Sequence, residues 1–329
     1  MVRLAEIARA AECSIGAVSK VLNPRSKSSI RVSETTRKRI EQAANKLGYR
    51  PNRSAEFLKK GYSPEIGIFL PSFKNDLVLD VIKGCSAAAN RAGFSLSYFF
   101  DLSKECFSAF LKEATGRRNC GLITYPRFQI DKETIEMLAN YRKSGGKVVF
   151  IESSGPETPL FLHELNRVCI DDRKGGIIVA EHFIEYQCRN FIVYGKYRPR
   201  IAGFIETVEK SGFTCRHFEQ QIPAQKIIDT ALKSKEKTGI FCTIDSVAAN
   251  IHTGLLLHGE IPGKNILLCG YDCLSGIQDL NPGLTSVYQP FFSAGEAAVN
   301  MLIDLIYDKT VQDITFVPEL VPRETSVGK

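Results

Sequence analysis

Three short stretches near the start of the chain have apolar side chains that recur at the spacing of an α-helix. Residues three and four apart lie on one face of a helix, so each stretch predicts a short amphipathic helix. Ser14 and Ser33 are suited to cap the second and third helices, and Gly48 to end the third. The three stripes consist of Leu4, Ile7, Ala8 and Ala11, of Val18, Val21 and Leu22, and of Ile40, Ala43, Ala44 and Leu47.

The outer face of the second predicted helix, in the stretch SIGAVSKVLN at residues 14–23, carries few charges and several small residues. A helix used only for packing more usually exposes Glu and Lys, whereas a helix in a DNA groove needs small residues and a few hydrogen-bonding ones for base edges. Two short helices around the tight turn ECS, braced by a third, match the helix-turn-helix plan. This favours DNA reading by residues 1–50.

A short helical pattern follows in the stretch YRPNRSAEFLKKGYSPE. Asn52 can cap it after Pro51, Gly61 can end it, and Ala55 and Leu58 share one face. So short a helix is unstable in isolation, so residues 51–61 are interpreted as a hinge that is helical only when held. A disordered tether is the alternative.

From residue 62 to residue 329 the chain alternates short apolar strands with amphipathic helices. This rhythm predicts an α/β core of parallel sheets with helices on both faces, and ten strands suggest two doubly wound subdomains. The expected strands are 66–70, 94–100, 120–124, 147–152, 167–170, 190–194, 213–218, 239–243, 265–270 and 284–287. The expected helices include 77–92, 131–144, 174–187, 224–234, 245–258 and 290–308. We expect a break near 153–165, with one lobe formed by about 62–160 and 290–316 and the other by about 161–289 and 317–329.

Positive charge is concentrated at the start of the chain. Residues 1–61 hold 14 Lys and Arg against 5 Asp and Glu, a net charge of +9, whereas the other 268 residues hold 29 against 31, a net charge of −2. Such an asymmetry indicates a polyanionic partner for a small N-terminal module. Charge alone would also fit a solvated basic arm. The helical pattern of residues 1–50 favours a DNA-binding module instead.

No secretory signal and no 18-residue apolar stretch is found, so a cytoplasmic protein is expected. The ten cysteines include no Cys-x-x-Cys pair, and the closest spacing, Cys269–Cys273, has no His at metal-ligand distance along the chain. We therefore interpret them as reduced thiols that serve as small core residues.

The sequence carries no catalytic signature. It has no G-x-S-x-G and no G-x-G-x-x-G, and GEIPGKN at 259–265 lacks the spacing and the Ser or Thr of a phosphate loop. We expect no enzymatic activity, no cofactor and no metal.

The stretches LAEIARAAECSIGAVSKVLN and VSETTRKRIEQAANKLGYRPNRSAEFLKKG resemble the DNA-binding headpiece of the lactose-repressor (LacI/GalR) family of bacterial transcription regulators. The resemblance implies that Tyr49, Asn52 and Arg53 hold phosphates, and that Ala55 and Leu58 lie on a hinge helix. Leu58 would wedge into the minor groove opposite its copy from a second subunit. Ser33 is included among the expected DNA-binding residues. Those implied to face the DNA are Leu4, Ser14, Ile15, Gly16, Ser19, Lys20 and Asn23.

Two features of this segment depart from the family. Lys20 stands where the family usually has Arg, so bidentate reading of guanine is lost and a point-charge contact remains. The loop PRSKSSIR, which precedes Val32 and Ser33, is about four residues longer than the loop that the family usually has there. Its basic residues would add phosphate contacts or simply be solvated.

The resemblance continues through the core, in VCIDDRKGG, RPRIAGF, GIFCTIDSVA, ILLCGYD, LTSVYQP, GEAAVNMLIDLI and VPELVPRETS. In the family this part looks like a periplasmic sugar-binding protein with a small ligand between two lobes. The resemblance implies that Arg200 donates to sugar hydroxyls or a carboxylate, and that Asp272 accepts from two hydroxyls. The other implied effector-binding residues are Ser72, Phe73, Asn75, Glu152, Asp245, Gln289 and Phe291.

Alternatives remain for this site. If these residues only stabilised the fold and bound no ligand, Arg200 would pair with a carboxylate and Asp272 would cap the next turn. Ile244 replaces the family's usual Asn, and the loop before Arg200 is short, so that Lys196, Tyr197 or Arg198 would reach in instead. An unusual sugar, a phosphorylated one, or a loss of effector binding all fit.

We therefore expect a homodimeric transcription regulator, a repressor, that binds operator DNA and is controlled by a sugar or sugar derivative through the pairing of hinge helices. A cytosolic sugar-binding protein without DNA function is the main alternative, and a sugar-modifying enzyme a weaker one.

Overall fold

The computed structural model describes residues 2–22, 30–49, 63–72, 76–125, 131–153 and 166–327. The chain divides into two compact units, Met1–Pro64 and Glu65–Lys329. Each unit has its own hydrophobic core, and each is described here by itself.

The first unit is a cluster of three helices, α1 (Leu4–Ala10), α2 (Ile15–Leu22) and α3 (Glu34–Lys46). Ile7, Val18 and Ile40 are fully buried at its centre, one from each helix. The predicted caps are present, because Ser14 Oγ accepts a hydrogen bond from Ala17 N at 3.1 Å and Ser33 Oγ accepts one from Thr36 N at 3.2 Å. The sequence prediction of a helix-turn-helix head is confirmed.

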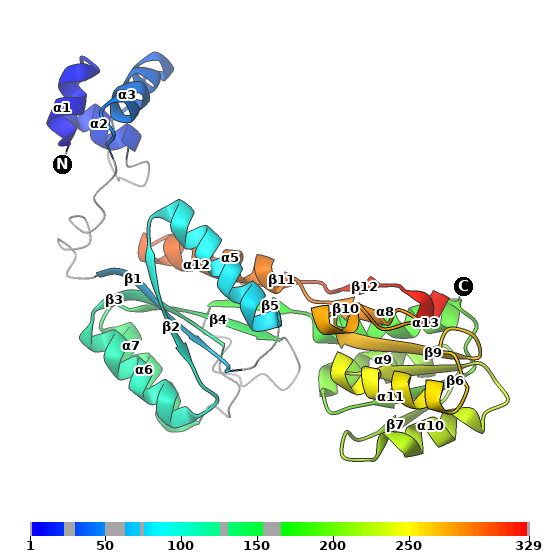
Figure 1. The fold of residues 1–329 in the computed structure, drawn as a ribbon. Helices are drawn as coiled ribbons and strands as arrows, with labels where there is room; N and C mark the ends of the chain where they lie inside the picture. The colour runs from blue at the N-terminus through cyan, green and yellow to red at the C-terminus, as the bar shows by residue number, and fades with distance from the viewer. Residues whose placement is uncertain are drawn as a thin grey trace. The chain divides into compact units, whose positions relative to one another are not determined.

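The second unit contains two six-stranded sheets, each covered by helices on both faces (Figure 1). The first sheet has the order β11-β5-β4-β3-β1-β2 and the second β12-β10-β9-β8-β6-β7. All neighbouring strands whose register is given are parallel except β10 and β12. We call the first sheet with its helices the first lobe, and the second sheet with its helices the second lobe.

The first lobe packs α5 (Asp76–Ala92) and α12 (Phe291–Ile306) side by side on one face of its sheet, and α6 (Lys104–Gly116) and α7 (Lys132–Lys143) on the other (Figure 1). A cluster of buried aromatic rings, with Phe69, Phe107, Phe110 and Phe150 at its centre, fills the space under α6 and α7. The strands are β1 (Ser63–Leu70), β2 (Ser95–Phe100), β3 (Asn119–Thr124), β4 (Lys147–Ser153), β5 (Asn166–Ile170) and β11 (Ile314–Phe316).

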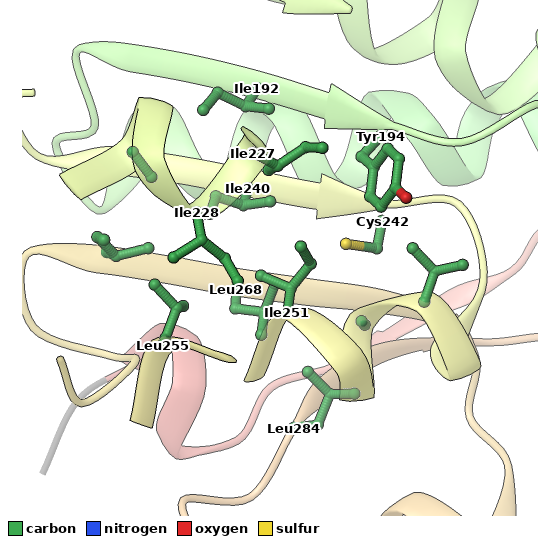
Figure 2. Packing of buried hydrophobic residues seen from close by; sticks show 14 of the residues in the cluster. Ile192, Tyr194, Ile227, Ile228, Ile240, Cys242, Ile251, Leu255, Leu268 and Leu284 are labelled. Atoms are coloured by element: carbon green, nitrogen blue, oxygen red, sulfur yellow. The ribbon is translucent and has the colours of Figure 1, made fainter. Parts of the chain in front are cut away.

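The second lobe places α10 (Ala224–Leu232) and α11 (Asp245–Leu257) on one face and α8 (Asp172–Glu185) and α9 (Arg198–Lys210) on the other. Figure 2 shows Ile192, Ile240 and Leu268 of three adjacent strands meeting Ile228 and Ile251 of the two covering helices. The strands are β6 (Asn190–Tyr194), β7 (Cys215–Phe218), β8 (Thr238–Cys242), β9 (Ile266–Asp272), β10 (Thr285–Tyr288) and β12 (Glu319–Val321), and α13 (Glu324–Val327) ends the described chain.

The chain crosses between the lobes after β5, after β10 and after β11. All ten predicted strands are present, but the position of the first crossing differs from the prediction. We expected the second lobe to begin at about residue 161, whereas β5 pairs with β4 in the first sheet, so that the crossing falls after Ile170. The apolar pattern of residues 166–170 predicts a buried strand, but the pattern does not say which sheet that strand joins.

Two strands were not predicted from the sequence. β11 and β12 have three residues each, too few to show an alternating pattern, and they lie on either side of the third crossing. Both are edge strands, and β12 is the one that runs antiparallel to its neighbour. Together they fix the last segment of the chain to both sheets.

The cysteines are mostly core residues, as expected. Six are buried, namely Cys85, Cys120, Cys169, Cys188, Cys242 and Cys269, and burial raises the pKa of the Cys188 thiol to about 12. Cys106 is exposed, which the sequence prediction did not anticipate. Among the described residues no cluster could hold a metal ion. No helix in the described ranges is long and apolar enough to cross a membrane.

Glycines allow the closest helix contacts in both lobes. A Cβ on Gly84 of α5 would lie 2.0 Å from the carbonyl oxygen of Phe292 in α12, and a Cβ on Gly176 of α8 would lie 2.0 Å from the carbonyl oxygen of Arg200 in α9. Gly203 of α9 faces Arg173 in the same way. The backbone position of α9, and with it that of Arg200, therefore depends on glycine at positions 176 and 203, because any larger residue would push the two helices apart.

We expect Gly176→Ala to destabilise the chain by about 1–3 kcal/mol, because the added methyl group forces α8 and α9 apart. Urea unfolding followed by circular dichroism measures this change. Gly116→Ala at the end of α6 is the matched control, since a Cβ there meets nothing within 4 Å. Equal unfolding midpoints for the two variants would show that the helix contact is not tight.

Candidate effector site and candidate DNA-binding surface

The candidate effector site lies at the carboxyl ends of the strands of the second sheet. Asp272 ends β9, Gln289 follows β10, and the segment from Thr243 to Asp245 follows β8. Because parallel strands end at the same edge of a sheet, these residues come together there, where open α/β sheets usually bind ligands. The sequence prediction that Arg200, Asp272 and Gln289 share one site is supported by direct contacts between them.

Arg200 is the centre of this cluster. It is the third residue of α9 and is 4% exposed. Its Nε donates to Asp172 Oδ1 at 3.1 Å, Nη1 to the carbonyl oxygen of Thr243 at 2.7 Å and to Asp272 Oδ1 at 3.3 Å, and Nη2 to Gln289 Oε1 at 3.3 Å. Burial by itself would lower the pKa of Arg200, but the carboxylates of Asp172 and Asp272 outweigh it, so the pKa is raised and the guanidinium stays charged.

Two tyrosine rings lie over the guanidinium. The Arg200 Cζ atom is 3.7 Å from the ring centroid of Tyr271 and 4.6 Å from that of Tyr197. Tyr271 also donates its hydroxyl to Asp172 Oδ1 at 3.2 Å, and burial raises its pKa well above the ordinary value, which keeps the hydroxyl protonated. Cation–π contact and hydrogen bonds together fix the plane of the guanidinium.

Asp272 is the polar residue of this cluster that is partly open to solvent. Its Oδ1 accepts from Arg200 and, at 2.8 Å, from Gln289 Nε2, which leaves Oδ2 without a hydrogen bond to any described residue. Burial raises the pKa of this carboxyl to about 7, although Arg200 opposes the shift. The backbone at Asp272 has φ = 108°, a value that side-chain-bearing residues rarely adopt.

Asp245 is close to this cluster, but its carboxylate binds protein groups near the turn that follows β9. It is fully buried, accepts from Leu274 N at 2.8 Å on Oδ2 and from Ser286 Oγ at 2.6 Å on Oδ1, and burial raises its pKa to about 6. Both carboxylate oxygens therefore have protein partners. Ile244, where the resemblance leads one to expect Asn, packs against the apolar cluster of the second lobe and offers no polar group to the site.

The residues predicted from the first lobe are less fully described. Phe291 is buried at the start of α12, with its ring 5.9 Å from that of Tyr125, and Ser72 is exposed just after β1. Phe73 and Asn75 lie outside the described residues, and for Glu152 only the backbone, in β4, is described. The structure thus brings together the second-lobe half of the predicted site.

Sequence reasoning missed Asp172, Tyr271 and the carbonyl group of Thr243. Asp172 is 2% exposed and lies in the stretch VCIDDRKGG, directly after the first crossing between the lobes. A pair of acidic residues directly after an apolar strand was an available signal for a buried carboxylate. Tyr271 gives no such signal, because a tyrosine in a strand normally packs in the core.

The candidate DNA-binding surface is formed by α2 and the residues around it. Ile15 is 53% exposed, Ser14 is exposed, and Gly16, Ser19 and Lys20 are half-buried. Leu4 and Tyr49 pack partly against the core of the head, and burial raises the pKa of Tyr49. Ser33 caps α3 and also contacts the hydroxyl group of Thr36. Asn23, Asn52, Arg53, Ala55 and Leu58 lie outside the described residues, as does the predicted hinge at 51–61.

Comparison with known proteins gives matches over both units. The model of the lacI family of bacterial regulatory proteins matches residues 3–52, and that of the periplasmic binding protein-like domain matches residues 180–326. The HTH-type transcriptional repressor PurR of Photobacterium profundum is 26% identical over 343 residues, covering 99% of this chain and 98% of that protein. The HTH-type transcriptional regulator RegA of Clostridium saccharobutylicum is 25% identical over 343 residues, covering 98% of each.

Solved structures share the fold. The Lac repressor dimer bound to operator and the anti-inducer ONPF matches with a TM-score of 0.68 at 22% identity, covering 99% of both chains. The complex of the transcriptional regulator CelR with cellobiose matches with a TM-score of 0.66 at 20% identity, covering 99% of this chain and 100% of that one. The proteins named here are transcriptional regulators, and none is named as an enzyme.

The raised pKa of Asp272 predicts a pH dependence of stability. The folded carboxyl binds its proton more tightly than the unfolded one, so its contribution to stability is present below a pH of about 4 and is lost as the pH rises to about 7. Asp272→Asn removes this contribution. We therefore expect the difference in unfolding free energy, wild type minus variant, to fall between these pH values in urea titrations. Parallel pH profiles would contradict the burial assigned to Asp272.

Proposed function

We propose that the chain is a DNA-binding transcriptional repressor of the lacI type, and that a small, hydroxyl-rich effector bound at the Arg200 cluster controls it. The domains that we propose are a DNA-binding head at 1–50, a hinge at 51–61 and an effector-binding and dimerisation core at 62–329. The observation that carries the effector proposal is the arrangement of Arg200, Asp272 and Gln289 at the carboxyl edge of the second sheet.

The chemistry of this edge suits a sugar. Asp272 Oδ2 can accept hydrogen bonds, and Oδ1 is already held by Arg200 and Gln289, so the carboxylate is oriented before a ligand arrives. Vicinal hydroxyl groups are good donors to such a carboxylate. The solved structures of CelR with cellobiose and of the Lac repressor with ONPG support a sugar or sugar derivative as the class of effector.

The head is proposed to place the outer face of α2 in the major groove of DNA, with Ser14, Ile15, Gly16, Ser19 and Lys20 toward base edges. The exposure of Ile15 supports this, since a head used only for packing would bury it. The charge of +9 on residues 1–61 supplies the phosphate attraction. Tyr49, Asn52 and Arg53 are proposed to hold phosphates.

We propose that two copies act together, with paired hinge helices carrying Ala55 and Leu58 in the minor groove. Exposed apolar side chains on the core support a second copy as partner. Leu257 is 82% exposed, and Leu256 and Ile261 line one surface hollow with Pro262 and Pro282. The solved Lac repressor dimer on its operator supports the same arrangement.

We expect the full-length chain to bind a random-sequence duplex with an affinity that falls steeply with salt, because phosphate contacts release counterions. Lys20→Ala should cost about 1–3 kcal/mol on a duplex that the chain has itself enriched from a random pool, and much less on the random duplex. Fluorescence anisotropy titrations at several salt concentrations measure both affinities.

The matched control for this titration is Lys46→Ala, which removes the same charge from the last turn of α3. It should leave the preference for the enriched duplex unchanged. A chain that binds no duplex at low salt would instead be a sugar-binding protein without DNA function, and the proposal would fail.

A thermal-shift screen of sugars and sugar phosphates tests the effector. A sugar at a hundredfold excess over its dissociation constant should stabilise the wild-type chain by about 2.7 kcal/mol. Asp272→Ala should abolish this stabilisation, and Asp229→Ala, which removes an exposed carboxylate of α10, should preserve it. Equal stabilisation of both variants would place the ligand elsewhere.

A further inference from the structure

The turn that follows β9, residues 272–275, has an unusual backbone. Asp272 has φ = 108° and the next residue, Cys273, has φ = 52°, and neither is glycine. Two consecutive residues in this region cost about 1–3 kcal/mol each, so the turn persists only where its surroundings hold it. The contacts that hold it come from both lobes.

On the second lobe, the buried carboxylate of Asp245 holds the turn. It accepts from Leu274 N at 2.8 Å, and it also accepts from Ser286 Oγ, whose oxygen in turn accepts from Cys273 N at 3.0 Å. The amide groups of two successive turn residues are therefore bound, directly or through one hydroxyl, to the same fully buried carboxylate. This side of the turn has little freedom to move on its own.

On the first lobe, the turn is bound by Asp76, the first residue of α5. Ser275 N donates to Asp76 Oδ2 at 2.7 Å, across 199 positions of sequence and from one lobe to the other. Hydrogen bonds from Ser275 hold the pKa of this carboxyl below its ordinary value. One turn later on the same helix, Asp80 adds to the effect of burial in raising the pKa of Tyr288 in β10.

We propose that residues 272–275 form a latch between the lobes, in which Asp76 is the positioning residue that fixes the angle between them. The effector part of this idea rests on the proposed function: a ligand that binds Asp272 acts three residues from the Ser275–Asp76 bond. Because Asp272 and Ser275 belong to one strained turn, a shift at the first residue is transmitted to the second. α5 receives the change, and it packs along α12, the helix that follows the second crossing.

The test measures the distance between the lobes in the full-length chain. Spin labels are attached to cysteines that replace Lys112 of α6 and Lys226 of α10, both exposed. The accessible native thiols are first changed to Ser, namely exposed Cys106 and half-buried Cys13, Cys215 and Cys273. Pulsed electron–electron resonance then gives the distribution of label distances. The measurement needs neither DNA nor effector.

Ser275→Pro is the sharpest variant, because it removes the donor N–H. Ser275 is the first residue of a short 3-10 helix, and Leu274 before it has φ = −65° and ψ = 147°, a conformation that proline accepts in its predecessor. Ser275→Ala keeps the N–H and removes only the hydroxyl group, so it separates the side-chain contribution to the contact with Asp76 from the backbone one. Asp76→Ala removes the acceptor, and Glu105→Ala, which removes an exposed carboxylate from the first turn of α6, is the control for it.

We expect Ser275→Pro and Asp76→Ala to broaden the label distribution or shift it by a few ångströms, Ser275→Ala to change it less than Ser275→Pro, and Glu105→Ala to reproduce the wild-type distribution. Because Ser275→Pro and Asp76→Ala break the same hydrogen bond from its two ends, the test stands even if one of the two variants does not fold. Wild-type distributions in both Ser275→Pro and Asp76→Ala would overturn the latch. Failure of the proposed function would appear separately, as loss of duplex binding by the labelled wild-type chain.

Discussion

The burial of one guanidinium group between two carboxylates and an amide is the constraint on which the second lobe depends. Arg200 reaches Asp172 at the start of α8, Asp272 at the end of β9 and Gln289 after β10. Asp172 and Gln289 lie at two of the three crossings between the lobes. A buried ion pair adds little net stability, but removing one partner leaves an unpaired charge and is strongly destabilising. The cluster therefore specifies the geometry of the crossings.

The geometry of the same cluster is set by close helix packing and by aromatic contacts. The close approach of α8 and α9 at Gly176 and Gly203 sets where Arg200 stands, and two tyrosine rings set how its plane is turned. Most of the donors of Arg200 are bound by protein groups, whereas Oδ2 of Asp272 has no hydrogen bond to any described residue and can accept one from a ligand. That atom lies at the head of a strained turn, which joins ligand chemistry to the contact between the lobes.

The sequence was sufficient for features that repeat along the chain and insufficient for those that depend on one residue. The helices of the head and the ten longer strands follow from periodic apolar positions, and Ser33 was identified as a cap because its role is local. The placement of β5 in the first sheet, the burial of Asp172 and the stacking of Tyr271 on Arg200 depend on partners far along the chain. The bond from Ser275 to Asp76 has no sequence signal, because its donor is a backbone amide.

The central claim is that a matched pair of basic heads reads DNA under the control of this two-lobed core. The measurement that tests it most directly is the sequence that the full-length chain enriches from a pool of random duplexes. A pair of α2 helices related by two-fold symmetry predicts an inverted repeat whose half-sites have equal weight. Enrichment of a single unrepeated site, or of no site at all, would contradict the account.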